Sequence, residues 1–227
     1  GRVIIAASNN VIDGFTITNG KISGEENGAG IHASDDIIIR NNIIDNNHTS
    51  RTQKAKGGGV YIFGSNESVI ENNIFMRNSS YYQGMALYIN SPSSNIIIRD
   101  NIFTLNYGIS SESDGTLYLD ESNPQIYRNI FCGNFGLGRA AGISYRESQG
   151  TASNNLFAGN ESKSESALFH TGVVYGIFKN NTIAFNYSKS NSAAIGIQGM
   201  ESTRFEYYNN IIAGQNGYGM REIYYGN

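Results

Sequence analysis

The chain has 227 residues with a net charge of −3; 30 residues are Asn, 27 are Gly and only 15% are charged. Asn and Gly are poor helix formers, whereas the 15 Tyr and 11 Phe residues favour strands, so the composition argues against a helical protein. The scattered charge argues against a nucleic-acid partner, the lone Cys132 excludes an intrachain disulfide, and no apolar run is long enough to span a membrane.

A short block recurs along the whole chain, with one or two polar residues followed by an apolar pair. In chain order the blocks are centred on Gly14, Asn42, Asn73, Asn101, Asn129, Asn155, Asn181 and Asn210, at spacings of 28, 31, 28, 28, 26, 26 and 29 residues. A second column of apolar anchors runs in phase with the first, at Ile31, Val60, Leu87, Leu117, Ile143, Leu168, Ile195 and Met220. Two columns with one shared period predict a solenoid, and we expect residues such as Ile43, Ile74 and Ile102 to form a single file down its interior.

The content of each repeat identifies the kind of solenoid. Leucine is scarce, and no segment keeps a 3.6-residue apolar period, which argues against leucine-rich and helical repeats. Each repeat instead holds two or three short strands, such as residues 36–40 and 95–99, separated by Gly, Ser and Asn turns. We therefore predict an all-β fold, a right-handed parallel β-helix solenoid of about eight coils with a period of about 28 residues, over residues 1–227 as a single domain.

Neither end of the chain contains a capping helix or a polar covering segment. Solenoids normally cap their ends, because an open coil presents unpaired backbone groups. Two hypotheses follow: the chain is an internal piece of a longer surface protein, or its coils associate end to end.

The Asn column has a predicted structural role. Stacked Asn amides can bond the turn backbone and also the amides above and below them. We expect such a ladder to be formed by Asn42, Asn73, Asn101, Asn129, Asn155, Asn181 and Asn210.

An aromatic column follows the anchors, at His32, Tyr61, Tyr88 and Tyr118. Since alternate residues of a strand point to opposite faces, these rings should point outward if the anchors point inward. The expected result is an exposed stripe of four stacked rings. It would either shield the sheet or offer a flat platform to sugar rings or to a neighbouring protein.

We predict no catalytic constellation, metal site or cofactor. Arg40, Glu71 and Arg99 occupy one column and predict a surface salt-bridge ladder. The acid pairs Glu112/Asp114 and Asp120/Glu121 could hold calcium through oxygen ligands, but solvated turns are favoured. Two long loops carry Glu25 with Glu26, and Arg51 with Lys54 and Lys56; long loops are where solenoids place binding residues.

The repeats resemble a known family. The motif FxxN is intact at Phe75–Asn78, Phe103–Asn106, Phe131–Asn134 and Phe157–Asn160, and a Gly-rich partner occurs at residues 28–31, 57–60 and 140–143. Both resemble the FxxN and GGA[ILV] motifs of chlamydial polymorphic outer-membrane protein repeats. The whole chain looks like the pectate-lyase-like superfamily, which includes adhesins, surface-layer components and polysaccharide lyases. The resemblance therefore implies the fold more than any activity.

The leading hypothesis is an extracellular or cell-surface β-helix with a structural or adhesive role. Its expected partner is a polysaccharide or a neighbouring surface protein that contacts the aromatic column, without catalysis. The alternative is a polysaccharide-active enzyme, a lyase or hydrolase, whose sign would be in-register carboxylates near an Arg or Lys on one exposed sheet. A second alternative, a phage tailspike or fibre, would require trimerisation.

Overall fold

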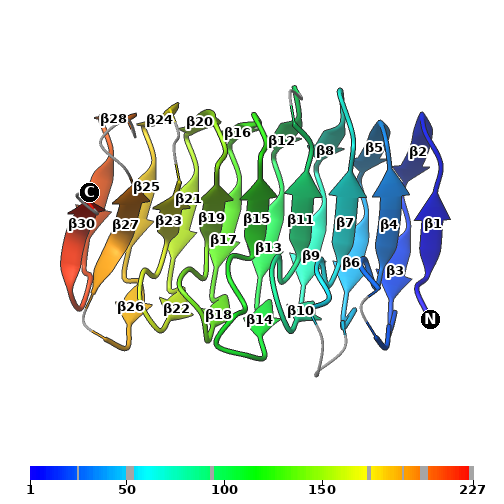
Figure 1. The fold of residues 1–227 in the computed structure, drawn as a ribbon, viewed down its shortest axis with the longest axis horizontal. Coiled ribbons are helices and arrows are strands. Elements are labelled where there is room, and N and C mark those ends of the chain that lie inside the picture. Colours follow the sequence, from blue (N-terminus) through cyan, green and yellow to red (C-terminus); the bar gives the residue numbers. More distant parts are fainter. Residues whose placement is uncertain are drawn as a thin grey trace.

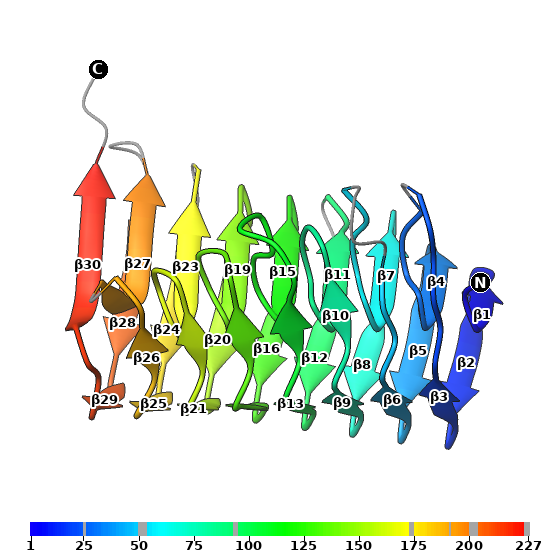
Figure 2. The ribbon, with the colours of Figure 1, turned by 90° about the horizontal axis from the view of Figure 1, so that it is seen from below.

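The chain winds into a right-handed parallel β-solenoid whose coils follow one another from the N-terminus to the C-terminus (Figures 1 and 2). The computed structural model describes residues 1–24, 26–49, 54–92, 95–172, 175–190, 192–199 and 204–224, with the backbone alone for 222–224. Its parallel sheets run along the axis and confirm the predicted architecture of about eight coils. No helix that could cross a membrane occurs in these described ranges.

The strands form four sheets, numbered here in the order in which each coil meets them. The first sheet contains β1 (Ile4–Ala6), β4 (Ile31–Ser34), β7 (Val60–Phe63), β11 (Leu87–Asn90), β15 (Leu117–Asp120), β19 (Ile143–Arg146), β23 (Leu168–Thr171), β27 (Ala193–Gly199) and β30 (Tyr218–Tyr224). The second contains β2 (Asn10–Asp13), β5 (Ile37–Arg40), β8 (Val69–Glu71), β12 (Ile97–Arg99), β16 (Gln125–Tyr127), β20 (Gly150–Ser153), β24 (Tyr175–Lys179) and β28 (Arg204–Tyr208).

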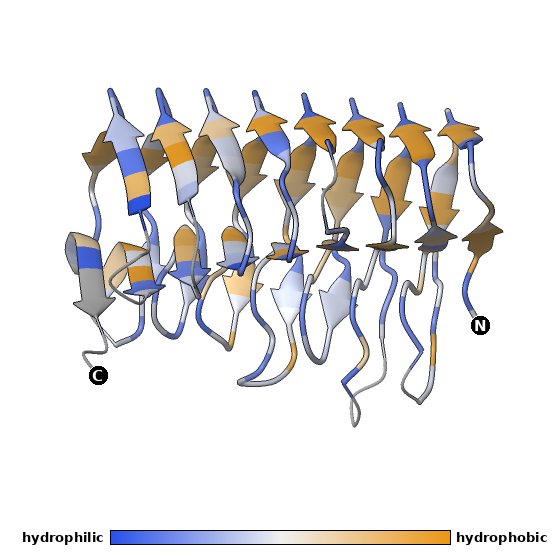
Figure 3. Cartoon of the chain, turned by 45° about the horizontal axis from the view of Figure 1, so that its top comes forward, coloured by the Kyte–Doolittle hydropathy of each residue, from blue (hydrophilic) through white to orange (hydrophobic). Residues whose placement is uncertain are grey.

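The third sheet contains β3 (Thr16–Thr18), β6 (Ile43–Asp45), β9 (Ile74–Met76), β13 (Ile102–Thr104), β17 (Ile130–Cys132), β21 (Leu156–Ala158), β25 (Thr182–Ala184) and β29 (Ile211–Ala213). The fourth is short and contains β10 (Ser79–Ser80), β14 (Tyr107–Gly108), β18 (Phe135–Gly136), β22 (Glu161–Ser162) and β26 (Tyr187–Ser188). Hydrophobic residues concentrate on the strands, and the turns between them are mostly hydrophilic (Figure 3).

Equivalent residues of successive coils pair directly with one another. The predicted anchors lie in one register, as in Ile31 with Val60 and Leu87 with Leu117, and they are buried except Met220 of the last coil, which is 36% exposed. In the third sheet Ile43, Ile74 and Ile102 also pair in register, but we expected this column to line the interior, and that was wrong. Ile43 and Ile102 are 40% and 38% exposed, and the next residue of each strand points inward instead.

The interior column of the third sheet is aromatic. Phe75, Phe103, Phe131 and Phe157 are fully buried, and their ring centroids are 4.6, 4.7 and 4.9 Å apart in a continuous stack. Stacking of identical rings follows from the register, because each coil places the same side chain at the same point. These are the Phe residues of the FxxN motifs.

The two residues of each Asn-Asn pair, or of its equivalent, have different structural roles. The first member lies in the left-handed backbone region, with φ between 51° and 57° at residues 41, 72, 100, 128, 154, 180 and 209. Asn and Asp tolerate this conformation better than other residues that have a side chain, which explains why five of the seven are Asn and one is Asp. The exception is Arg128, whose guanidinium forms two hydrogen bonds of 2.7 Å to Asp100.

The second member forms the predicted ladder. Asn101 Oδ1 accepts hydrogen bonds from both the backbone N–H and the Nδ2 of Asn73, each 3.0 Å long. Its own Nδ2 donates to Ile70 O at 2.9 Å and to Asn129 Oδ1 at 3.0 Å. The same pattern confirms the ladder from Asn42, Asn73, Asn101, Asn129, Asn155 and Asn181 to Asn210.

A second ladder was not predicted. It consists of the Asn residues that end the FxxN blocks and of the equivalent residues Asn47 and Asn186: Asn47, Asn78, Asn106, Asn134, Asn160 and Asn186. All are buried, and Gln215 Oε1 accepts the backbone N–H of Asn186 in the last coil. The two ladders hold the turns on either side of the third sheet.

Candidate functional site

Outward-facing polar side chains gather where strands β11, β15, β19 and β23 end. Asn90, Asp120, Arg146 and Thr171 occupy equivalent positions of the four strands and pair in register. Because successive strands are about 4.8 Å apart, Asp120 and Arg146 are brought together although 26 residues separate them. Arg146 Nη1 lies 3.1 Å from Asp120 Oδ1.

The Asp120 carboxylate is the centre of a buried hydrogen-bonded network. The Tyr88 hydroxyl donates to Asp120 Oδ2 at 2.5 Å, and Lys56 Nζ donates to the Tyr88 hydroxyl at 2.7 Å. Lys56 Nζ also lies 3.9 Å from Asp120 Oδ2 and 4.4 Å from the centroid of the Tyr88 ring. Burial lowers the pKa of the Lys56 ammonium, and the Asp120 carboxylate partly offsets that effect. The pKa of Tyr88 is raised, first by burial and then by its hydrogen bond to Asp120.

The aromatic column stacks as predicted, but its full exposure was predicted wrongly. Ring centroids of His32, Tyr61, Tyr88 and Tyr118 are 5.2, 5.1 and 5.5 Å apart, and the Tyr rings are nearly parallel. His32 and Tyr61 are half-buried, whereas Tyr88 and Tyr118 are only 1% and 3% exposed. Side chains from the preceding loops contact these two, since Lys56 bonds Tyr88 and Gln83 Nε2 donates to the Tyr118 hydroxyl at 2.8 Å.

A hollow of about 340 Å³ opens beside this network, and we call it the charged groove. Its lining residues come from the first sheet and from the loops that precede it: Tyr82, Gln83, Ser111, Glu112, Asp114, Tyr118, Arg139, Arg146 and Thr171. Two carboxylates and two guanidinium groups therefore face one space together with tyrosine side chains. Its volume lies at the small end of the range of about 300–1,000 Å³ that is typical of ligand sites.

Asp114 and Asp120, whose charges both act on the Tyr118 hydroxyl, differ in environment. Burial raises the pKa of the Asp114 carboxyl to about 6, although the backbone N–H of Arg139 donates a hydrogen bond to it. The Asp120 carboxylate, in contrast, has a guanidinium and an ammonium group beside it. Asp114 is therefore a group that can exchange a proton near neutral pH.

Arg139 supplies one of the two guanidinium groups of the groove. Its guanidinium carbon lies 5.0 Å from the centroid of the buried Phe169 ring. The residue is exposed, and its guanidinium makes no ion pair within the described residues. A guanidinium held over a ring has lost part of its side-chain freedom before a ligand arrives, which favours binding of an anionic or polar group.

The other charged residues predicted from the sequence form ion pairs or ring contacts where the structure describes them. Arg99 pairs with Glu71 at 2.5 Å as expected, but Arg40 pairs with Asp13 at 2.8 Å. In the long loops Glu26 lies 3.4 Å from Arg2, while Glu25 and Arg51 fall outside the described residues. Lys54 Nζ lies 5.4 Å from the centroid of the Tyr82 ring.

No cluster of three or more His, Cys, Asp or Glu side chains suited to a metal ion occurs in the described part of the chain. Glu112 and Asp114, one of the acid pairs considered for calcium, line the charged groove instead. In the other pair, Asp120 is buried in the network and Glu121 is exposed.

The sequence contained one signal of this site that we did not use. Asp120 and Arg146 each lie three residues after an apolar anchor, Leu117 and Ile143, so the repeat alone places them on adjacent coils and on the outer face. Asp114 and Arg139 carry no such signal, because they lie in loops whose lengths differ from coil to coil.

Replacing Tyr88 by Phe tests the buried network. The change removes the hydroxyl that joins Lys56 to Asp120, and it is expected to lower the free energy of unfolding by about 1–3 kcal/mol. Tyr61→Phe is the matched control, because its hydroxyl has no hydrogen-bond partner among the described residues and its ring belongs to the same stack. Equal denaturant unfolding curves for the two variants would contradict the network.

A comparison with known protein families gives one match. Residues 1–157 match the model of a family described as the right handed beta helix region. No curated protein and no solved structure matches the chain.

Proposed function

Because the chain belongs to the right-handed β-helix family, we propose that it is an extracellular or cell-surface structural or adhesive protein that contacts a polysaccharide through the charged groove. The polysaccharide was expected to contact the aromatic column, and we now place this contact at the adjacent groove. Two rings of that column, Tyr88 and Tyr118, are buried and cannot form a flat platform.

One observation carries the proposal: two guanidinium groups and two carboxylates face a single hollow beside the half-buried Tyr82 ring. Sugar hydroxyls need both donors and acceptors, and a ring face can pack against the apolar side of a sugar. Uncharged hydroxyl and amide groups of Ser111, Thr171 and Gln83 add further partners. The set suits a polar, ring-shaped ligand better than an apolar one.

The way successive coils are joined supports a structural role for the protein. Two continuous Asn ladders and a stacked Phe column tie each coil to the next over most of the length. Each turn is thus held by hydrogen bonds to its neighbours rather than by loop packing alone, which suits a rigid rod that displays a groove on one face.

The test is binding of a panel of polysaccharides, neutral and acidic, by the chain and by its Arg139→Gln variant. We expect at least about a tenfold loss of affinity for the bound polysaccharide, since a charge-assisted hydrogen bond contributes roughly 1.5–3 kcal/mol. Arg77→Gln is the matched control, because Arg77 is exposed and pairs with Asp45. It follows strand β9 of the third sheet and does not line the groove. Equal affinity of Arg139→Gln and Arg77→Gln would reject the groove as the contact site.

A second candidate function is cleavage of the polysaccharide at the same groove. It is favoured by the Asp114 carboxyl, whose pKa burial raises to about 6, because acid–base hydrolysis needs a group that can donate a proton near neutral pH. In the described part of the first sheet only one carboxylate, Asp120, pairs in register with an arginine, so the first sheet meets the predicted sign of an enzyme in part.

Release of reducing ends or of unsaturated uronate from the polymer that binds would test cleavage. The Asp114→Asn variant keeps the size of the side chain and removes the acid, so it is expected to abolish turnover while binding is retained. Binding without turnover in the unchanged chain would remove the enzyme hypothesis and leave the binding proposal intact.

A further inference from the structure

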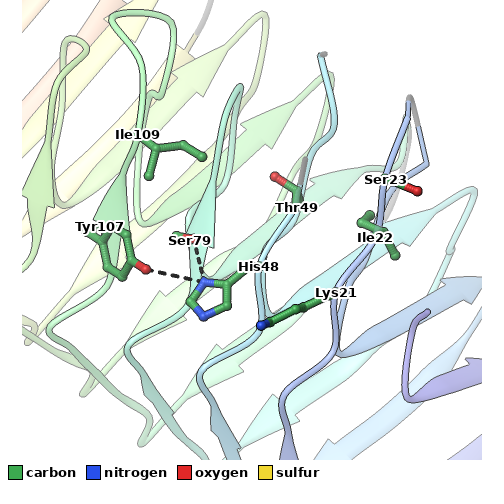
Figure 4. Close-up of a pocket in the computed structure, with 8 residues that line it drawn as sticks. All are labelled: Lys21, Ile22, Ser23, His48, Thr49, Ser79, Tyr107 and Ile109. Atoms are coloured by element: carbon green, nitrogen blue, oxygen red, sulfur yellow. Dashed lines mark hydrogen bonds between the residues drawn. The ribbon is translucent and has the colours of Figure 1, made fainter. Parts of the chain in front are cut away.

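A second hollow, of about 430 Å³, is lined by residues between Lys21 and Ile109, none of which lines the charged groove. Eight side chains line it, as Figure 4 shows: Lys21, Ile22, Ser23, His48, Thr49, Ser79, Tyr107 and Ile109. Four of them follow one outward column, because Lys21 pairs with His48, His48 with Ser79 and Ser79 with Tyr107 on successive coils. Lys21 and Tyr107 therefore lie at opposite ends of this column, on either side of His48 (Figure 4).

Hydrogen bonds fix which nitrogen of His48 carries the proton. Asn46 Nδ2 donates to Asn19 Oδ1 at 2.7 Å, which turns Asn46 Oδ1 toward His48 Nε2, 2.8 Å away. Because that oxygen can only accept, Nε2 is the protonated nitrogen. Nδ1 then offers a single lone pair, and the Ser79 hydroxyl lies 2.7 Å from it.

Among the described residues, the Tyr107 hydroxyl has one long contact, with His48. Its oxygen lies 3.4 Å from His48 Nδ1, whose lone pair already receives the shorter bond from Ser79. At this distance it is a long contact, compared with about 2.7–3.2 Å for a normal hydrogen bond. The half-buried Tyr107 therefore has a donor available for an acceptor inside the hollow.

Lys21 brings a positive charge to the hollow. Its side chain is exposed and makes no ion pair or hydrogen bond within the described residues. None of the eight lining residues is acidic. One ammonium and several hydroxyl groups thus face a space without a carboxylate, which favours an anionic ligand.

We propose that this hollow binds a small organic carboxylate, with Lys21 and Tyr107 contacting the carboxylate oxygens. A single ammonium group balances one negative charge, so a monoanion fits better than a sulfate or phosphate dianion. Ile22 and Ile109 line the same space and provide an apolar surface for a short carbon chain attached to the carboxylate. The proposal concerns a different set of residues from the charged groove and does not depend on it.

The test is titration of the chain with butyrate, acetate and sulfate, followed by chemical-shift changes of the His48 ring and of the backbone amides around it. Butyrate is expected to bind at about millimolar concentration, more tightly than acetate, and sulfate most weakly. Lys21→Met is expected to weaken butyrate binding by at least about tenfold, and Tyr107→Phe by several-fold.

Lys179→Met is the matched control, because Lys179 is an exposed lysine of the second sheet. It should leave butyrate binding unchanged, and thermal melts should show that all three variants fold. Absence of shifts around His48, equal affinity of Lys21→Met and the unchanged chain, or tighter binding of sulfate than of butyrate would each overturn the proposal. Polysaccharide binding by the Arg139→Gln variant reports separately on the groove.

Discussion

Replacing Asn101 by Ala is expected to lower the free energy of unfolding by about 3–5 kcal/mol, because several buried polar groups each lose a hydrogen bond at once. The affected groups are the backbone N–H and Nδ2 of Asn73, the carbonyl of Ile70 and Oδ1 of Asn129. Water cannot easily replace the amide, since the ladder residues are at most 2% exposed from Asn42 to Asn181. Denaturant unfolding monitored by circular dichroism measures the loss.

The control for this prediction is Asn95→Ala. Asn95 is exposed and lies just before β12, so its replacement is expected to change stability by less than about 0.5 kcal/mol. If both variants unfold at the same denaturant concentration as the unchanged chain, the ladder does not stabilise the coils. Ile or Leu at position 101 should be no better than Ala, because neither restores a donor or an acceptor.

Replacing His170 by Leu is expected to make the protein more resistant to acid. His170 lies in the interior between the rings of Tyr145 and Phe205, and neither ring nitrogen has a hydrogen-bond partner among the described residues. Burial lowers the pKa of His170 from 6.5 to about 3. Between about pH 3 and 6.5 the unfolded chain therefore binds a proton at His170 that the folded chain does not bind. The free energy of unfolding is highest above pH 6.5 and falls as the pH decreases toward 3.

The size of this effect follows from the same shift. The difference between the two pKa values corresponds to roughly 3–5 kcal/mol of stability lost by about pH 3, a loss that Leu at position 170 would not suffer. Ile62, Ile89 and Leu119 occupy the same interior column, so an aliphatic side chain suits the site. Unfolding at pH 7 and at pH 4 measures the difference. An equal fall in stability for His170→Leu and the unchanged chain would show that His170 is not the acid-sensitive group.

The repeat period was enough to predict the register of the coils. Once residues such as Leu87 and Leu117 are assigned to one column, every outward and inward position of the first sheet follows. The third sheet was harder, because its strands are apolar on both faces. Ile43 and Ile44 are equally hydrophobic, and only the inward Phe residues of later coils distinguish the buried face.

Loop placement limited the prediction of the site. The direction of Tyr88 and Tyr118 was correct, but their burial depends on Lys56 and Gln83, which reach over them from loops of irregular length. Period-two alternation assigns a face to a side chain and does not report what covers that face. For the same reason Asp114 and Arg139, which define the charged groove, could not be placed from the repeat.

Distances between spin labels on the outer face of the third sheet test the stacking of coils most directly. Labels would be attached to Cys at positions 43 and 130, or at 43 and 211, after replacement of the exposed Cys132 by Ser. These pairs are three and six coils apart, and at about 4.8 Å per coil the separations between the labelled backbones should be roughly 14 and 29 Å. A second distance that is not about twice the first would contradict the stacked solenoid, and with it both ladders and the charged groove.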